Sequence, residues 1–117
     1  MNIRQQVQKM DAILSQGAIV EAVKEFFAEN ANTSDYGNGA TTGKAAMIAK
    51  MEGFTGSIAK VNGITHHRSI VDGHTSASEF TFDFDMVDGS KVYWHEVIRR
   101  IWNDEGQVIQ EEYFNAA

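Results

Sequence analysis

Apolar residues recur at helical spacing through the first half of the chain. Ile3, Val7, Met10 and Leu14 fall on one stripe, which predicts a helix that ends near Gly17. Two further stripes predict helices over 18–27 and 44–54, and their apolar positions are Ala18, Ala22, Val23, Phe26, Phe27, Met47, Ile48, Met51 and Phe54.

The stretch between the second and third of these helices is polar and rich in glycine. Residues 30–43 therefore predict a loop that can hold one short hairpin. Thr42, just ahead of the third helix, is the expected N-cap, because its side-chain oxygen can accept a hydrogen bond from a backbone N–H of the first turn.

The second half of the chain alternates at strand spacing. Asp72-Gly73 and Asp88-Gly89 each lie between strand-like runs and suit two-residue type I′ turns, and 104–106 suits a three-residue turn. The expected strands are 64–71, 75–86, 91–102 and 108–115. Helices followed by an antiparallel meander predict one α+β domain over 1–117, with three N-terminal helices packed on one face of a curved sheet.

Counting across these turns pairs the side chains that share a face of the sheet. Phe82 then opposes His95, and a polar row of His67, Ser78, Arg99 and Glu111 crosses the face that carries Phe80, Phe82, Phe84 and Tyr113. Burial of three phenylalanines, at about 1.5–3 kcal/mol each, favours this face under the helices. The Arg99–Glu111 pair has two interpretations: a partly desolvated functional pair, or a solvated ion pair at the end of the sheet.

Composition excludes several classes of protein. The 117 residues include no cysteine and no proline, so disulfides, thiolate metal sites and proline-rich linkers are ruled out. The formal net charge of −6 has the wrong sign for a nucleic-acid-binding protein. The sequence has no membrane-spanning run and no apolar stretch of signal-peptide type at residues 1–14, which predicts a soluble cytoplasmic protein with no membrane partner.

Two groups of segments resemble one protein family. FAENA (27–31), TSD (33–35) and GKAA (43–46), followed by DG (88–89), WNDEGQVI (102–109) and EEYF (111–114), are similar to SnoaL-like and ketosteroid-isomerase-like proteins of the NTF2-like superfamily. This resemblance implies a cone, in which the curved sheet wraps around the helices and encloses a largely apolar pocket. It also implies a homodimer, which the family commonly forms through its sheets.

The resemblance implies a role for Asp35, which matches the general base of the steroid isomerases. Asp11 and Ile98 occupy the positions where those isomerases carry hydrogen-bond donors to the enolate oxygen, and loss of one donor can cost ~10²–10³ in rate. Steroid isomerisation is therefore not expected.

The resemblance and the turn counting disagree on the third meander strand. Followed without gaps, the resemblance turns Trp94, Glu96 and Ile98 toward the pocket, whereas counting turns Tyr93, His95, Val97 and Arg99 there. One β-bulge would reconcile the two, because an extra residue reverses every face beyond it. If the phenylalanines face outward instead, they would form a dimer interface.

The candidate catalytic residues are Asp35 and His95. Asp35 is either a proton-transferring pocket carboxylate or a turn residue that caps backbone N–H groups. His95 is either an acid–base group or a satisfied core histidine. The candidate substrate-binding residues are His67, Phe80, Phe82, Trp94, Arg99, Glu111 and Tyr113.

His67 would bind an anionic ligand group or serve as a polar residue at the end of the sheet. Trp94 would stack on a flat ligand or pack in a core or interface. His66 and His67 are adjacent in a strand and point to opposite faces, so they cannot chelate one ion. A metal site would need His67 with His95 or Asp35; no metal and no cofactor is expected.

The functional hypothesis is a pocket protein for a small hydrophobic or partly polar molecule. Its chemistry, if any, would be acid–base proton transfer of the isomerase, cyclase or dehydratase class. The alternative is a non-catalytic ligand-binding or dimerisation module. An epoxide hydrolase is a third possibility, but it needs two aspartates beside Arg99 or Arg100, and the sequence places none there.

Overall fold

A computed structural model describes residues 2–35 and 38–116 of the chain. Within them lie three helices and six strands in the order α1 (Ile3–Ser15), α2 (Ile19–Phe26), β1 (Phe27–Asp35), β2 (Asn38–Thr42), α3 (Lys44–Gly56), β3 (Ile58–Asp72), β4 (Thr75–Met86), β5 (Lys91–Trp102) and β6 (Val108–Asn115). The α+β class is therefore as predicted. The polar stretch that was expected to hold a hairpin provides β1 and β2.

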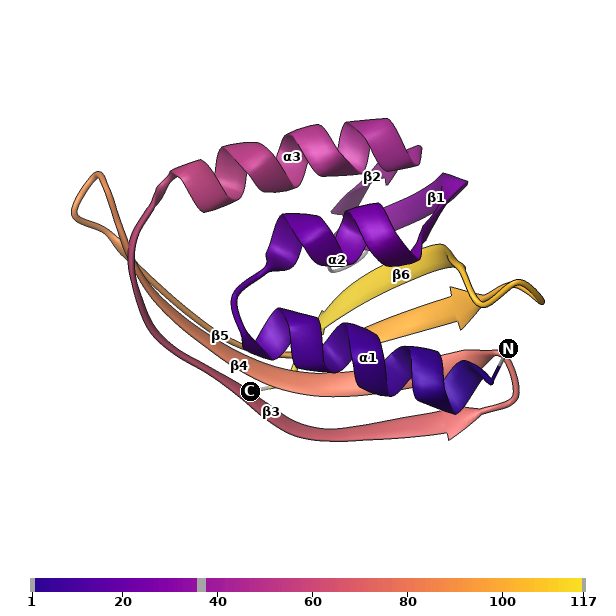
Figure 1. Cartoon of the computed structure of the whole chain (residues 1–117). Helices are drawn as coiled ribbons and strands as arrows, with labels where there is room; N and C mark the ends of the chain where they lie inside the picture. The colour runs from indigo at the N-terminus through magenta and orange to yellow at the C-terminus, as the bar shows by residue number, and fades with distance from the viewer. Residues whose placement is uncertain (1, 36–37, 117) are drawn as a thin grey trace.

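The strands form one sheet in the order β2-β1-β6-β5-β4-β3. All neighbours are antiparallel except β1 and β6, which run parallel. Figure 1 shows the long strands β3 and β4 bending around the helices, which lie together on one side of the sheet. The meander was predicted from local turns, but the parallel contact of β1 with β6 joins segments about eighty residues apart and left no local signal.

The first helix begins and ends close to the predicted positions. Asn2 caps it by accepting from the backbone N–H of Gln5, and Gly17 follows its end with φ +83°. The prediction of Thr42 as the cap of α3 is wrong. Gly43 holds that position with φ +94° and no side-chain cap bond, while the Thr42 hydroxyl donates across the hairpin to Asn32 Oδ1. Phe27 also leaves the second helix and opens β1.

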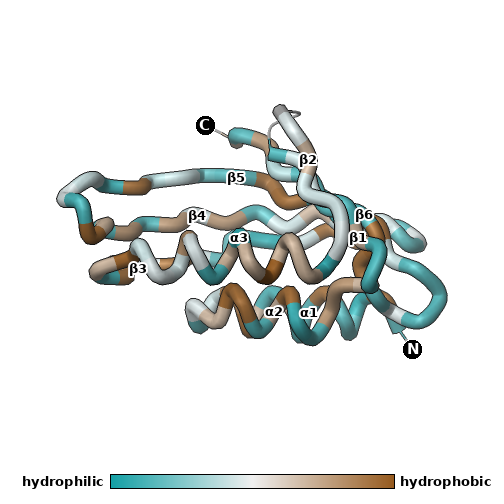
Figure 2. The backbone as a smooth tube through the Cα atoms, turned by 90° about the horizontal axis from the view of Figure 1, so that it is seen from above, coloured by the Kyte–Doolittle hydropathy of each residue, from teal (hydrophilic) through white to brown (hydrophobic). Residues whose placement is uncertain are grey.

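The hydrophobic core fills the space between the helices and the sheet. Hydrophobic and hydrophilic segments follow one another along the helices in Figure 2, as expected for helices with one buried side. Phe26 meets the edge of the Trp102 ring at 6.2 Å, and both side chains are buried. No helix in the described part of the chain is long and apolar enough to cross a membrane.

Phe80, Phe82 and Phe84 face the helices and are buried, as their hydrophobicity predicted. The residues opposite them on β5 differ from the turn counting. Phe82 pairs with Trp94, and Phe84 pairs with Val92. The pocket side of β5 is therefore the one that the family resemblance implied, and the predicted inward placement of His95 and Arg99 is wrong.

The physical cause is the length of the β4–β5 turn. The Met86 N–H donates to the Ser90 carbonyl at 2.9 Å, and the Gly89 N–H returns to the Met86 carbonyl at 3.0 Å. The loop thus holds three residues, 87–89, with Gly89 in the left-handed region at φ +89°. One residue more than a type I′ turn shifts the register by one and reverses the face of every residue on β5.

The two other hairpins also depart from simple counting. The β3–β4 loop is Gly73-His74, and an extra residue bulges out of β3 between His66 and Arg68. This bulge places His67 on the outer face of the sheet, opposite to the helices. On β6, Glu111 pairs with Arg100 and Glu112 pairs with Arg99.

Candidate functional site

A cavity of about 200 Å³ lies between the helices and the sheet. Most of its wall is apolar and comes from all three helices and from β4 and β5. The apolar lining comprises Met10, Leu14, Ile19, Ala22, Val23, Met51, Phe54, Phe82, Phe84, Trp94 and Ile98. The polar lining comprises Asp35, Lys50, Glu96, Arg100, Glu111 and Tyr113.

Aromatic rings build one part of this wall. Phe54 of α3 stacks on Trp94 with a centroid distance of 5.4 Å and meets the edge of Phe84 at 5.8 Å. Trp94 remains 40% exposed, so its ring lines the cavity and also reaches solvent. The resemblance-based orientation of Trp94 toward the pocket is therefore confirmed.

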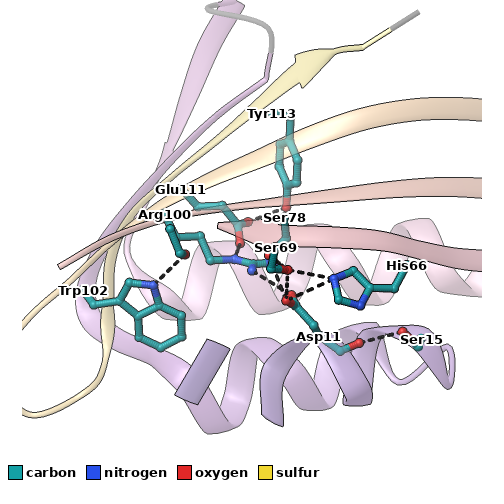
Figure 3. A network of polar contacts seen from close by, with 10 residues as sticks. Asp11, Ser15, His66, Ser69, Ser78, Arg100, Trp102, Glu111 and Tyr113 are labelled. Carbon is teal, nitrogen blue, oxygen red and sulfur yellow. Dashed lines mark hydrogen bonds and ion pairs between the residues drawn. The ribbon is translucent and has the colours of Figure 1, made fainter. Parts of the chain in front are cut away.

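Arg100 is the centre of a buried polar network (Figure 3). Its Nε donates to Glu111 Oε2 at 2.8 Å, and its Nη1 donates to Asp11 Oδ1 at 3.3 Å. The side chains of all three residues are at most 3% exposed. Burial alone lowers the pKa of Arg100, but the charges of Glu111 and Asp11 outweigh it and raise that pKa, so the guanidinium stays charged.

Asp11 is held by further donors from the sheet. Ser69 and Ser78 both donate to Asp11 Oδ2, at 2.5 and 2.9 Å, and His66 Nε2 lies 3.5 Å from the same oxygen. Sequence reasoning treated Asp11 only as a departure from the isomerase pattern. The signal that could have found it is its place four residues after Val7, on the buried stripe of α1, where a charge requires a partner.

Tyr113 extends the network toward the cavity. Its hydroxyl donates to Glu111 Oε1, the carboxylate oxygen that Arg100 does not bind. Burial, followed by the charge of Glu111 and this hydrogen bond, raises the pKa of Tyr113 well above its ordinary value of 10. Tyr113 is therefore a neutral phenol at physiological pH, and its oxygen lone pairs remain available as acceptors.

Asp35 reaches the same cavity from β1. Its backbone pairs with that of Tyr113 in the parallel β1–β6 ladder, and both side chains line the cavity. Asp35 is exposed, in contrast to the buried Glu111. Of the three carboxylates in the lining, Asp35 is thus accessible to solvent, whereas Glu111 is fixed by Arg100 and Tyr113. Two carboxylates in such different surroundings can serve in different steps of proton transfer.

The structure brings together five of the predicted site residues and separates four. Asp35, Phe82, Trp94, Glu111 and Tyr113 line the cavity. Phe80 faces inward but is fully buried in the core, where it stacks on His66. His67, His95 and Arg99 lie on the outer face, and their predicted pocket positions are wrong, because both hairpins of β5 and the bulge of β3 reverse the faces that were counted.

On the outer face these three residues have partners of their own. Arg99 pairs with Glu112, so the predicted Arg99–Glu111 pair is replaced by two pairs, one on each face. His95 Nε2 lies 2.6 Å from Glu79 Oε2, and His67 Nε2 lies 2.7 Å from Thr81 Oγ1. The hydrogen bond from His95 lowers the pKa of Glu79. Burial acts in the opposite direction, and the charges of Arg68, His67 and His95 lower this pKa further.

No protein-family model and no curated protein sequence matches the chain. Solved structures match it closely in fold. A protein from Mesorhizobium loti, described as a SnoaL-like polyketide cyclase, superposes with a TM-score of 0.86 at 22% identity and covers 97% of this chain and 99% of its own.

Two further structures have the same fold. A protein with a ketosteroid-isomerase-like fold from Catenulispora acidiphila, in complex with trimethylamine, has a TM-score of 0.75 at 14% identity, over 93% of this chain and 83% of its own. An LEH-like epoxide hydrolase from M. tuberculosis has a TM-score of 0.76 at 14% identity, over 96% and 83%. The fold is thus that of the NTF2-like proteins, as the sequence resemblance implied, and proteins of this fold differ in activity.

Proposed function

We propose that this protein binds a small, mainly apolar organic molecule in its cavity and catalyses a cofactor-free proton transfer on it. The reaction would be of the isomerase, cyclase or dehydratase class. The observation that carries the proposal is the convergence of Asp35, Glu111 and Tyr113 on an apolar cavity of about 200 Å³. Pockets with an apolar wall and a few convergent polar groups are the usual form of small-molecule sites.

The size of the cavity limits the ligand. An engineered apolar cavity of about 150 Å³ is enough to bind benzene. The cavity of about 200 Å³ therefore suits a molecule somewhat larger than one aromatic ring. The stacked Phe54 and Trp94 offer a flat surface for such a molecule at the exposed side of the cavity.

The charge of the lining favours a neutral or cationic ligand. The lining has three carboxylates, of Asp35, Glu96 and Glu111, and two cations, of Lys50 and Arg100. Arg100 also pairs with the additional carboxylate of Asp11. An anionic ligand would add to this excess of negative charge in surroundings of low dielectric, which is unfavourable. The expectation that His67 binds an anionic ligand group has no support in this arrangement, because His67 lies on the outer face of the sheet.

The direction of the Tyr113 hydrogen bond indicates which polar group the ligand carries. Tyr113 gives its hydrogen to Glu111, so it can accept a hydrogen bond from the ligand but would have to release Glu111 to donate one. A hydroxyl or amine on the ligand satisfies the Tyr113 oxygen directly. Asp35, on the neighbouring strand, would then accept a proton from a carbon of the ligand and return it elsewhere.

Epoxide hydrolysis is a second candidate, favoured by one observation. Arg100 lies between two carboxylates, Asp11 and Glu111, so one aspartate and one glutamate flank it where the expected arrangement has two aspartates. Glu111 reaches the cavity directly, whereas Asp11 is enclosed by Ser69, Ser78 and Arg100. Addition of water to an epoxide would use Glu111 with Tyr113 rather than Asp35.

The test combines binding and turnover. A thermal-shift screen would compare hydroxyketones, lactones, aromatic amines, hydrophobic acids and small epoxides, and products would be analysed by mass spectrometry and NMR. We expect neutral or cationic compounds to raise the melting temperature and acids to have no effect. Asp35→Asn should keep binding and lose proton exchange or turnover, while Asp72→Asn, an exposed carboxylate outside the cavity, should behave as wild type.

The outcomes separate the possibilities. Turnover that survives Asp35→Asn but is lost in Glu111→Gln would replace proton transfer by the epoxide candidate. Stabilisation of all variants without any product would leave the alternative of a non-catalytic ligand-binding module. Failure of every compound to raise the melting temperature would contradict the pocket proposal itself.

A further inference from the structure

Three side chains of the kinds that bind transition metals meet on the outer face of the sheet. His67 comes from β3, Glu79 from β4 and His95 from β5. The nitrogen and oxygen atoms that they could offer to a metal all lie within 4.8 Å of one another. The two imidazole rings are 5.2 Å apart and tilted by 54°. This cluster lies on the opposite face of the sheet from the cavity.

The register of the sheet creates this cluster. His95 of β5 pairs with Thr81 of β4. Glu79 lies two residues before Thr81 on β4, so it is the diagonal neighbour of His95 on the same face of the sheet. The bulge between His66 and Arg68 turns His67 to that face as well. The three residues are spread over 29 positions of the sequence without a metal-binding spacing, which explains why no motif reveals them.

Neighbouring groups hold the three side chains in place. Arg68 Nε binds Glu79 Oε1 at 3.0 Å, which leaves Oε2 directed at His95 Nε2. Thr81 Oγ1 contacts His67 Nε2 at 2.7 Å. Contacts of this kind beyond the ligands fix the orientation of metal-binding side chains in known sites.

We propose that His67, Glu79 and His95 form a binding site for a zinc-type divalent cation on the outer face of the sheet. Two imidazoles and one carboxylate are an established ligand set for Zn²⁺, with the fourth position open to water. In the single chain the side chains of His95 and Glu79 are 32% and 22% exposed, so a cation can reach them from solvent. Ligand atoms around tetrahedral zinc lie about 3.4 Å apart, so small side-chain rotations complete the site.

The experiment is a zinc titration of the full chain, purified without a histidine tag and stripped with a chelator. Calorimetry should show one zinc ion bound per chain. Co²⁺ in place of zinc should give the visible absorption of a four-coordinate site. Even changes beyond the ligands cost ~10- to 100-fold in metal affinity, so His67→Ala, His95→Ala and Glu79→Gln should each weaken binding by at least about tenfold.

His74→Ala is the matched control. His74 is an exposed histidine in the β3–β4 turn that pairs with Asp104, so its loss should leave zinc affinity unchanged. Circular dichroism of each variant verifies folding, and Glu79→Gln, which keeps the size of the side chain, tests the site if a histidine variant unfolds. Absence of zinc binding by the wild type, or equal affinity in the ligand variants and the control, would overturn the proposal. Neither result bears on the cavity, which shares no residue with this cluster.

Discussion

Arg100 is the residue on which the polar part of the cavity depends, because its charge balances two buried carboxylates. Arg100→Met would leave Asp11 and Glu111 buried without a cation, and removal of one partner from a buried pair costs about 3–5 kcal/mol. Arg99→Met, one residue earlier, is the control. Arg99 pairs with Glu112 on the outer face with 39% of its side chain exposed, so this change should cost less than about 1 kcal/mol. Urea unfolding measures both, and equal losses would contradict the assigned faces of β5.

The buried phenol of Tyr113 should make the free energy of unfolding depend on pH in the alkaline range. Its raised pKa means that the folded chain holds the phenolic proton more tightly than the unfolded chain. Its contribution to the free energy of unfolding is therefore present below about pH 10, the ordinary tyrosine pKa, and is lost at higher pH by up to ~1.4 kcal/mol per pH unit. Tyr113→Phe should flatten this alkaline decline, measured by urea unfolding between pH 8 and pH 11.

The same substitution has a cost at neutral pH. Without the hydroxyl, Glu111 Oε1 loses its donor, and a buried acceptor left unpaired costs about 1–3 kcal/mol. Tyr93→Phe is the control, because Tyr93 is 63% exposed on the outer face. If the free energy of unfolding falls equally steeply with alkaline pH in Tyr113→Phe and in the wild type, the burial of the Tyr113 phenol does not cause the decline.

At the level of elements, the sequence predicted where most strands of the meander begin and end, but the length of the β4–β5 turn decided which side of β5 faces the cavity. The strands of the meander follow from alternation and from the Asp-Gly turns, and three of the four have the predicted bounds. Asp88-Gly89, however, fits both a two-residue turn and the three-residue turn that the structure contains. That single residue decides whether His95 or Trp94 faces the cavity. Local turn chemistry does not resolve this choice, because both turns place Gly89 at positive φ.

Two glycines test the role of backbone conformation in these elements. A methyl group at Gly89 meets no atom within 4 Å, but its φ of +89° is unfavourable for other residues, so Gly89→Ala should lower stability by about 1–2 kcal/mol. A methyl group at Gly53 also has open space, but Gly53 lies within α3, where Gly→Ala should raise stability by about 0.5–1 kcal/mol. Opposite shifts in melting temperature are the expected result, and shifts of the same sign would contradict it.

For the whole molecule, the sequence predicted the layers better than the site. Amphipathic helices and an apolar strand face are enough to predict that α1, α2 and α3 cover the sheet. The site depends instead on contacts between distant segments. Asp11 meets Arg100 across 89 residues, and Asp35 lies beside Tyr113 only because β1 joins β6 in parallel. The homodimer stays a prediction, which light scattering during gel filtration would test.

The cavity between the helices and the sheet should determine how the whole molecule tolerates a larger buried side chain. Ala22 of α2 is fully buried and lines the cavity, whereas Ala31 of β1 is equally buried but is not part of its wall. A larger side chain forced into a filled interior costs about 1–3 kcal/mol. Ala31→Leu should incur that loss in urea unfolding. Ala22→Leu should cost less than about 1 kcal/mol, because its extra atoms enter the cavity.

Ala22→Leu should also abolish the thermal shift given by any compound that stabilises the wild type, since it occupies the space that the ligand needs. Binding of such a compound should change the fluorescence of Trp94, which lines the cavity. The change should be absent in Trp94→Phe, which retains only the fluorescence of the buried Trp102. Equal destabilisation by both leucines would mean that the interior is solid. Retained ligand binding in a stable Ala22→Leu variant would mean that the compound binds elsewhere on the protein.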